Sequence, residues 1–184
     1  MKQTNFNVAY INRCTETEGP GKRLAIWFQG CDKRCKGCCN PELLDLKPAN
    51  IISLATLLNV IEEARESFGI EGVTYLGGEP ALQQNLPELS SKTMEMGLGV
   101  IMFTGSRVEE LNDELRSAAD MIIDGSFESD KPDEKRNLIG STNQRIVHVT
   151  DRYRSCEDWF YSSRPKQVDI NVSGGFFMTG DVLP

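Results

Sequence analysis

The chain has 184 residues and a formal net charge of −7, from 20 basic and 27 acidic side chains. This length predicts a single domain over residues 1–184, with a core over about 10–150 and a C-terminal extension over 151–184. The acidic balance argues against binding to a nucleic-acid backbone. No apolar run approaches the ~18–20 residues of a membrane span, and the N-terminus carries no secretory signal. We therefore expect a cytoplasmic protein that binds neither nucleic acid nor membranes.

Short apolar segments alternate with segments of helical period along the chain. Strands are expected at residues 23–28, 72–76, 99–104, 121–123 and 145–149. Helices are expected at 53–68 with Ser53 as the N-cap, at 86–96, from a Ser106-x-x-Glu109 capping box to about residue 119, and at 155–161. Residues 167–179 are expected to form a β-hairpin around Ser173-Gly174-Gly175.

This alternation predicts an α/β fold with a mostly parallel sheet and crossover helices. A closed eightfold barrel typically needs about 250 residues, which this chain does not have. We expect an open partial (βα) barrel of about six mostly parallel strands, followed by a hairpin-like tail. Chemistry in such folds lies at the carboxyl ends of the strands, which here are followed by residues 30–38, 77–80, 104–105 and 124–125.

Cysteine usage is the unusual feature of the composition. Four of the six cysteines fall within the nine residues 31–39, and the other two are Cys14 and Cys156. Such clustering in a reducing compartment indicates metal or redox chemistry rather than disulfides. The C-x3-C-x2-C spacing of Cys31, Cys35 and Cys38 provides three thiolates, which can hold three irons of a 4Fe-4S cluster and leave the fourth iron open.

Three basic side chains lie among these cysteines, and they are expected to favour the thiolate form: Lys33, Arg34 and Lys36. Two other interpretations remain open at this stage. One is a zinc site with Cys39, Cys14 or Cys156 as the fourth ligand. The other places the three cysteines on one buried helix face. Cys39 is expected not to be a ligand, Cys14 and Cys156 to be inert buried thiols, and His148 to be a packed residue.

The cysteine motif followed by Gly77-Gly78-Glu79-Pro80 resembles the radical S-adenosylmethionine superfamily. Residues 19–23 and 28–31 resemble the activating enzymes of glycyl radical enzymes. More narrowly, residues 124–127 (DGSF) and 140–144 (GSTNQ) resemble the activating proteins of anaerobic ribonucleoside-triphosphate reductase. The resemblance covers about residues 10–150.

This resemblance implies two cofactors, a 4Fe-4S cluster and S-adenosylmethionine. It implies that the open iron chelates S-adenosylmethionine, which is cleaved reductively to a 5′-deoxyadenosyl radical, with no catalytic side chain beyond the cofactors. The Gly77-Gly78 backbone would approach the methionine moiety, with Glu79 and Pro80 following it and Glu79 binding the ammonium group. Thr104 and Asp124 would contact the ribose or carboxylate region, directly or through a cation.

Two positions depart from the family pattern. Gly37 stands where many members have an aromatic residue near the adenine, and Cys39 stands where activating enzymes often have an aromatic residue or histidine. We therefore expect the backbone of Gly37, Cys38 and Cys39 to contact the adenine without stacking on it.

The implied function is the installation of a glycyl radical on a partner enzyme, with a flavodoxin-like or other low-potential electron donor. Two alternatives stay open from the sequence. The first is a radical S-adenosylmethionine enzyme that modifies a peptide or a small metabolite. The second is a non-catalytic iron–sulfur or zinc module.

Overall fold

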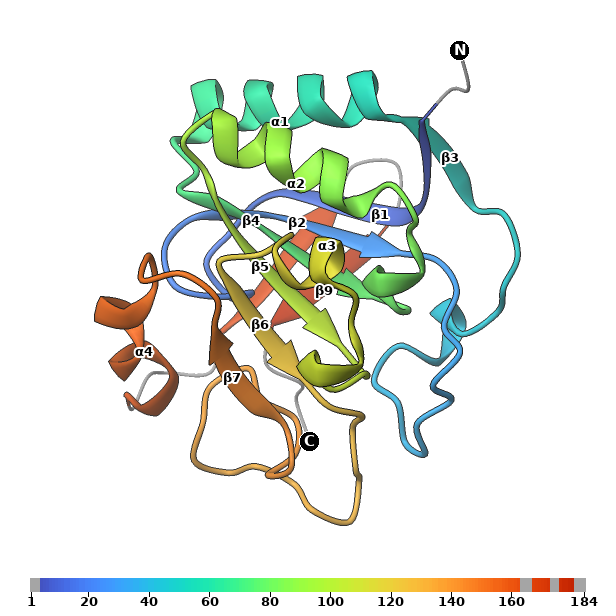
Figure 1. The fold of residues 1–184 in the computed structure, drawn as a ribbon, viewed down its shortest axis with the longest axis vertical. Helices are drawn as coiled ribbons and strands as arrows, with labels where there is room; N and C mark the ends of the chain where they lie inside the picture. The colour runs from blue at the N-terminus through green and yellow to red at the C-terminus, as the bar shows by residue number, and fades with distance from the viewer. Residues whose placement is uncertain (1–3, 163–166, 173–175, 181–184) are drawn as a thin grey trace.

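The computed structural model describes residues 4–162, 167–172 and 176–180. Seven strands form one mixed sheet in the order β3-β1-β2-β4-β5-β6-β7, and β8 pairs with β9 as a separate hairpin (Figure 1). The strands are β1 Asn5–Thr15, β2 Arg23–Phe28, β3 Asn50–Ser53, β4 Gly72–Gly77, β5 Gly99–Thr104, β6 Met121–Asp124, β7 Arg145–His148, β8 Val168–Val172 and β9 Phe176–Gly180. The α-helices are α1 Leu54–Phe68, α2 Leu86–Glu95, α3 Asp113–Arg116 and α4 Asp158–Tyr161. Single 3-10 turns lie at η1 Pro41–Leu43, η2 Pro80–Leu82, η3 Val108–Glu110 and η4 Arg154–Cys156.

The centre of the sheet consists of the parallel strands β2, β4, β5 and β6. Their registers bring the strand ends together, since Phe28 pairs with Gly77 and Thr104 pairs with Asp124. The antiparallel strands β1, β3 and β7 flank this centre. The expected α/β fold with a mostly parallel core is therefore confirmed, and its carboxyl ends meet along one edge.

The strands β1 and β3 were not expected from the sequence. β1 pairs with β2 and β3, so the strand at 23–28 is the second of the sheet rather than the first. The pairing of β1 with β2 shifts register twice, after Val8 and after Asn12, which breaks the strict alternation that a strand prediction depends on.

Helices α1 and α2 cover one face of the sheet (Figure 1). Ser53 caps α1 as expected, because its hydroxyl oxygen accepts the N–H of Thr56 at 3.2 Å. Gly69 ends the helix at a positive φ of 65°. The core between helices and sheet includes the buried residues Leu24, Ile26, Leu57, Ile61, Leu89 and Val100. No helix in the described part of the chain is long and apolar enough to cross a membrane.

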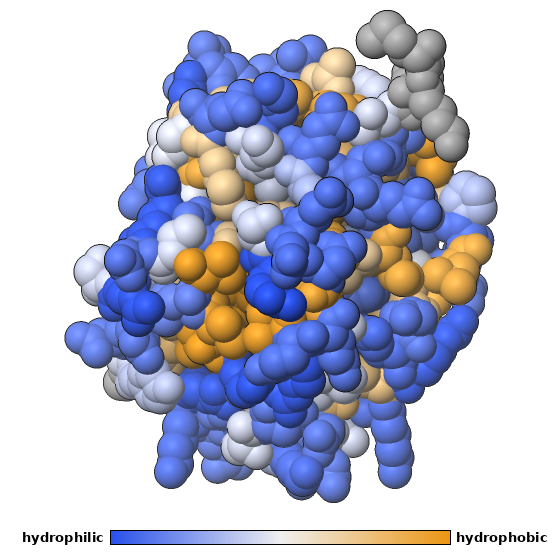
Figure 2. Space-filling model, viewed as in Figure 1, coloured by the Kyte–Doolittle hydropathy of each residue, from blue (hydrophilic) through white to orange (hydrophobic). Residues whose placement is uncertain are grey.

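The prediction of one helix from Ser106 to about residue 119 is wrong. The backbone forms η3 and then the four-residue helix α3, which Asn112 caps. The expected bond from the N–H of Ser106 to Glu109 is replaced by one from the N–H of Arg107 to the Glu110 carboxylate, and Asp124 accepts the N–H of Val108. Because α3 is short, it covers little of the sheet, and Figure 2 shows hydrophobic surface over the region of β6 and β7.

The C-terminal hairpin expected at 167–179 is confirmed in β8 and β9, although its turn at 173–175 lies outside the described residues. It lies on the side of the sheet away from α1 and α2 (Figure 1). Polar contacts join it to β1: the Thr15 hydroxyl donates to Asp169 at 2.5 Å, and Asn12 Nδ2 donates to Thr179 Oγ1 at 3.4 Å. The hairpin therefore packs on a face of the main sheet without extending its edge.

Candidate functional site

The expected cysteine ligands lie in one loop that leaves the carboxyl end of β2. Backbone hydrogen bonds from Gly30 to Leu43 and from Cys31 to Leu44, at 2.9 and 3.3 Å, close this loop. Its backbone has positive φ at Gly30 (98°), Arg34 (52°) and Gly37 (71°). A helix does not accommodate such angles. The interpretation that the cysteines share a buried helix face is therefore wrong.

All cysteines of the loop are free thiols. Cys31 is buried, Cys35 and Cys38 are half-buried, and Cys39 is exposed. The N–H groups of Lys33 and Asn40 point to the sulfurs of Cys31 and Cys38, each at 3.4 Å. Burial raises the pKa of the Cys31 thiol, and backbone hydrogen bonds from Lys33 and Arg34 oppose this. Metal binding rather than neighbouring charge would therefore deprotonate Cys31.

The donor set of the loop fits a 4Fe-4S cluster. Three thiols extend from one loop, and backbone N–H groups already point to two of their sulfurs. Thiolates are the ligands that iron–sulfur clusters take. Cys31, Cys35 and Cys38 are therefore the residues that would hold the cluster.

The expected Gly77-Gly78-Glu79-Pro80 segment joins the end of β4 directly to the cysteine loop. Gly78 N donates to Phe28 O and Glu79 N donates to Gly30 O, each at 2.8 Å. A methyl group on Gly77 would lie 2.6 Å from the nitrogen of Phe28, and one on Gly78 would collide with the carbonyl of Gly30. The two glycines therefore permit the close approach of the backbone after β4 to the backbone at the end of β2. This structural requirement for glycine is separate from the contact with a ligand that the sequence predicts.

Glu79 is a buried carboxylate at the centre of this edge, with 2% of its surface exposed. Its Oε1 accepts the N–H of Ala81 at 3.0 Å, and its Oε2 accepts the N–H of Gly105 at 2.8 Å. Burial raises the pKa of Glu79, while hydrogen bonds from Gly105, Thr104 and Ala81 oppose the rise. Pro80 is buried at the start of η2 behind it. The result is a fixed, desolvated carboxylate beside the cysteine loop.

Thr104 and Asp124, the other expected ligand contacts, end the neighbouring strands β5 and β6. Thr104 is buried, and its Oγ1 accepts the N–H of Ser106 at 3.1 Å. The fully buried carboxylate of Asp124 accepts Arg145 Nε at 2.9 Å, Val108 N at 2.8 Å and Arg107 Nη1 at 3.2 Å. These protein donors already surround the Asp124 carboxylate.

Burial by itself would raise the pKa of Asp124. Hydrogen bonds from Arg145 and the Val108 N–H, together with the charge of Arg145, outweigh that effect and lower this pKa below its ordinary value. Asp124 is therefore a carboxylate anion that binds the side chains of Arg107 and Arg145. Its contact with S-adenosylmethionine stays a prediction.

Sequence reasoning did not find Arg107 and did not place Lys33. Arg107 Nη1 donates to Asp124 and to the carbonyl of Asn143, and 38% of its side chain is exposed. The stem of Lys33 lies over Gly105, where a methyl group would be 2.7 Å from its Cγ, and its charge lowers the pKa of Glu79. Both side chains bring positive charge to the edge that carries the cysteines: Lys33 belongs to the cysteine loop itself, whereas only the fold brings Arg107 there.

The residues expected to have no part in the chemistry lie away from this edge. Cys14 and Cys156 are half-buried against hydrophobic clusters, so packing accounts for both. The His148 side chain is buried, with Nε2 3.7 Å from Glu157 Oε2.

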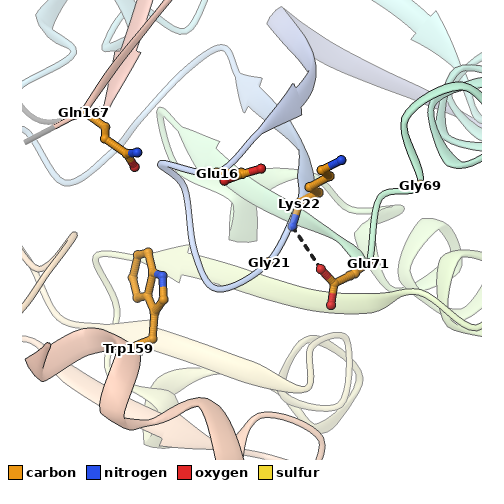
Figure 3. Close-up of a pocket in the computed structure, with 7 residues that line it drawn as sticks. All are labelled: Glu16, Gly21, Lys22, Gly69, Glu71, Trp159 and Gln167. Atoms are coloured by element: carbon orange, nitrogen blue, oxygen red, sulfur yellow. Dashed lines mark hydrogen bonds between the residues drawn. The ribbon is translucent and has the colours of Figure 1, made fainter. Parts of the chain in front are cut away.

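A cavity of about 570 Å³ opens at the opposite end of the parallel strands. Figure 3 shows Glu16, Lys22, Glu71 and Trp159 around it, with the N–H of Lys22 donating to Glu71 at 3.3 Å. Its lining comes from segments that lead into β2 and β4, from α4 and from Gln167, and includes no expected site residue. The candidate site is therefore the carboxyl edge rather than this cavity.

Comparisons with known proteins agree with this geometry. A family model described as a 4Fe-4S single cluster domain matches residues 17–147. The anaerobic ribonucleoside-triphosphate reductase-activating protein of Enterobacteria phage T4 is 30% identical over 152 residues, which are 79% of this chain and 96% of that protein. Its counterpart from Escherichia coli K12 is 26% identical over 140 residues, 71% of this chain and 91% of that protein. The crystal structure of QueE from Escherichia coli matches with a TM-score of 0.50 at 16% identity, covering 65% of this chain and 70% of QueE, and so supports the partial-barrel fold.

Replacing Cys31, Cys35 or Cys38 by Ala is expected to prevent stable cluster assembly, because each thiolate would bind a separate iron. Iron and sulfide analysis with absorption spectra after anaerobic reconstitution tests this. Cys156→Ala is the matched control and should retain a full cluster. A full cluster in any of the three variants would contradict the ligand assignment.

Replacing Asp124 by Asn is expected to lower the free energy of unfolding by ~1–3 kcal/mol at neutral pH, because two arginines lose their shared anion. Since folding lowers the pKa of Asp124, its stabilisation is present above the unfolded pKa of about 3.9 and is lost as the pH falls through the folded pKa. Urea denaturation at neutral and acidic pH measures both effects. The exposed Asp113, which pairs with Arg116, provides the control Asp113→Asn. Unchanged stability of Asp124→Asn at neutral pH would contradict the prediction.

Proposed function

Because this chain belongs to the 4Fe-4S single-cluster domain family of radical S-adenosylmethionine enzymes, we propose that it is an activase that installs a glycyl radical on an anaerobic ribonucleotide reductase. The observation that carries the proposal is the match to the phage activating protein, which spans 96% of that protein at 30% identity. The cysteine loop and the Gly78–Glu79 backbone, joined at the carboxyl edge, provide the chemical setting that such an activity needs.

The cofactors have defined places in this proposal. Cys31, Cys35 and Cys38 hold the cluster, and the edge between the cysteine loop and Glu79 receives S-adenosylmethionine. When bound, the cluster supplies the electron that cleaves S-adenosylmethionine to methionine and a 5′-deoxyadenosyl radical able to take a hydrogen atom from glycine. The protein contributes orientation and exclusion of water around that event.

Glu79 is the residue we assign to the ammonium group of the methionine moiety. Its carboxylate is fixed by backbone N–H groups on both oxygens, so binding a ligand requires no reorientation. Its raised pKa reflects a buried anion that its neighbours only partly stabilise, and a cationic ligand supplies what is missing. Lys33 and Arg107, which bring positive charge to the same edge, suit the carboxylate end of the same ligand.

The shape of this edge suits a protein substrate. Four loops border it, at residues 29–49, 78–85, 105–112 and 125–144, and the only helical structure described within them is the short 3-10 turns η1, η2 and η3. A glycine presented on a partner's loop has no side chain to obstruct its approach. An anaerobic ribonucleotide reductase is therefore the substrate we propose, with a low-potential protein such as a flavodoxin as the electron donor.

The direct test is anaerobic activation of an anaerobic ribonucleotide reductase from the same genome. The reduced, reconstituted protein with S-adenosylmethionine is expected to generate a glycyl radical on the reductase, visible by electron paramagnetic resonance. A reductase whose radical-bearing glycine is replaced by alanine is the control and should give no such signal. Cleavage of S-adenosylmethionine that never yields a radical on the reductase would contradict the activase role and favour a peptide or small metabolite as the substrate.

Replacing Glu79 by Gln is expected to weaken S-adenosylmethionine binding about 10- to 100-fold, because a charge-assisted hydrogen bond to the ammonium is lost. The free energy of unfolding should change by less than about 1 kcal/mol, since loss of a desolvated charge offsets one unsatisfied backbone N–H. Calorimetric titration and urea denaturation measure the two quantities. Glu42→Gln removes an exposed carboxylate of η1 as the control. Unchanged affinity in Glu79→Gln would remove Glu79 from the binding site.

A further inference from the structure

The cysteine loop has an inner side, which lies against Gly105, and an exposed outer side. Lys33 belongs to the inner side, because a methyl group on Gly105 would lie 2.7 Å from its Cγ. Arg34 and Lys36, the other two basic residues among the cysteines, are exposed. Cys35 stands between them in the sequence and is half-buried. The outer side of the loop therefore presents two cations next to a residue that would hold the cluster.

No internal partner accounts for these two cations. The side chains of Arg34 and Lys36 form no hydrogen bond or ion pair within residues 4–162, 167–172 and 176–180. Most basic side chains in the same part of the chain do have an acidic partner, as Arg13 has in Glu63 at 2.7 Å. Arg34 and Lys36 therefore remain available to the charges of another molecule.

The cysteine loop is a basic patch on an acidic protein. Residues 31–40 carry three basic side chains and one acidic side chain, whereas the whole chain has a net charge of −7. An acidic macromolecule is repelled by such a protein in most orientations and attracted in the one that brings it to the basic patch. Because exposed charges are screened beyond a Debye length of about 8 Å at physiological salt, the attraction acts only on a partner that docks at the loop.

The backbone of the loop holds both cations in defined places. Cys38 N donates to the carbonyl of Cys35 at 3.3 Å, which forms a turn around Lys36. Arg34 has a φ of 52°, a left-handed conformation that is uncommon outside glycine, so the loop rather than the residue's own preference sets its backbone. A surface with a fixed backbone loses little conformational entropy when a partner binds.

We infer that Arg34 and Lys36 form the docking surface for an acidic electron-transfer protein, which reduces the cluster from the outer side of the cysteine loop. The inference rests on the proposed function, since only a cluster that must be reduced needs a donor. One electron leaves the donor, which is oxidised, and reduces the cluster, while no bond forms or breaks.

The position of the two cations favours a donor over the protein substrate as the occupant. A protein substrate has to reach the side of the loop where S-adenosylmethionine is received, beside Glu79. An electron needs only a short path to a cluster ligand, and Cys35 provides one between Arg34 and Lys36. A donor docked on the outer side also leaves the inner side open for the other two reactants.

Donor binding and cluster reduction are measured separately on the reconstituted protein. Calorimetric titration with an oxidised flavodoxin of net negative charge gives the affinity, and electron paramagnetic resonance of rapidly frozen samples follows cluster reduction by the same flavodoxin in its reduced form. Replacing Arg34 and Lys36 together by Gln should weaken flavodoxin binding about tenfold and slow reduction to a similar degree. The difference from the original protein should shrink at ~0.5 M salt, because screening weakens contacts between exposed charges.

The affinity for S-adenosylmethionine and the photoreduction of the cluster with deazariboflavin, which needs no docked protein, should not change in this double variant. Lys36→Gln alone should weaken flavodoxin binding about threefold. Its matched control is Lys22→Gln, which removes an exposed lysine at the opposite end of the parallel strands and should leave this affinity unchanged. Cluster content and thermal unfolding verify that the variants fold.

Unchanged flavodoxin binding in the double variant, an equal loss in Lys22→Gln, or no binding to the unsubstituted protein would overturn the docking role. Weaker binding of the reductase with flavodoxin binding intact would also overturn it, since the surface would then belong to the protein substrate. If protein reduced with deazariboflavin left S-adenosylmethionine uncleaved, the proposed function would fail. That assay contains no donor protein, so its failure is distinct from any effect of Arg34 or Lys36.

Discussion

The site depends on the close approach of two backbones, the end of β4 and the start of the cysteine loop. Gly78 and Glu79 donate N–H groups to carbonyls at the end of β2 and at Gly30, each at 2.8 Å. Side chains at positions 77 and 78 would prevent this approach. Since Glu79 follows directly, its buried carboxylate is placed beside the cysteines by main-chain geometry rather than by flexible side chains. The parallel pairing of β2 with β4 holds both segments in register.

Much of this arrangement is predictable from the sequence, for identifiable reasons. β2 and β5 match the expected bounds because each contains an uninterrupted apolar run, at 24–28 and 100–103, with polar residues or glycine on either side. The cysteine motif and the glycine pair follow two of these strands, so parallel pairing alone brings them to one edge. β1 escaped prediction because its register shifts and its buried polar residues, such as Asn12, conceal the alternation of a strand.

Other features depend on contacts that no local pattern encodes. The helix expected after Ser106 is interrupted at Leu111 and Asn112, where the backbone is extended and the Asn112 side chain caps the separate helix α3. The carboxylate of Asp124 holds Arg107 and Arg145, which lie on either side of it in the sequence. Phe127 meets Gly37 only once the sheet has formed. The sequence therefore predicts which strand ends carry the chemistry, whereas the side chains that border the site become visible only in the tertiary structure.

The backbone contacts that tie these loops together also bear on how far related chains can diverge. The bond from the amide of Glu79 to the carbonyl of Gly30 joins two main-chain groups and does not depend on any side chain, whereas the two contacts of Gly105 require the carboxylate of Glu79 and the hydroxyl of Ser126. Outward-facing residues of these loops can thus change without loss of the contacts, provided that positions 77 and 78 stay glycine and that a carboxylate and a hydroxyl stay at positions 79 and 126. The surface of these loops can then vary independently of the backbone contacts that hold the cysteine loop against the end of β4.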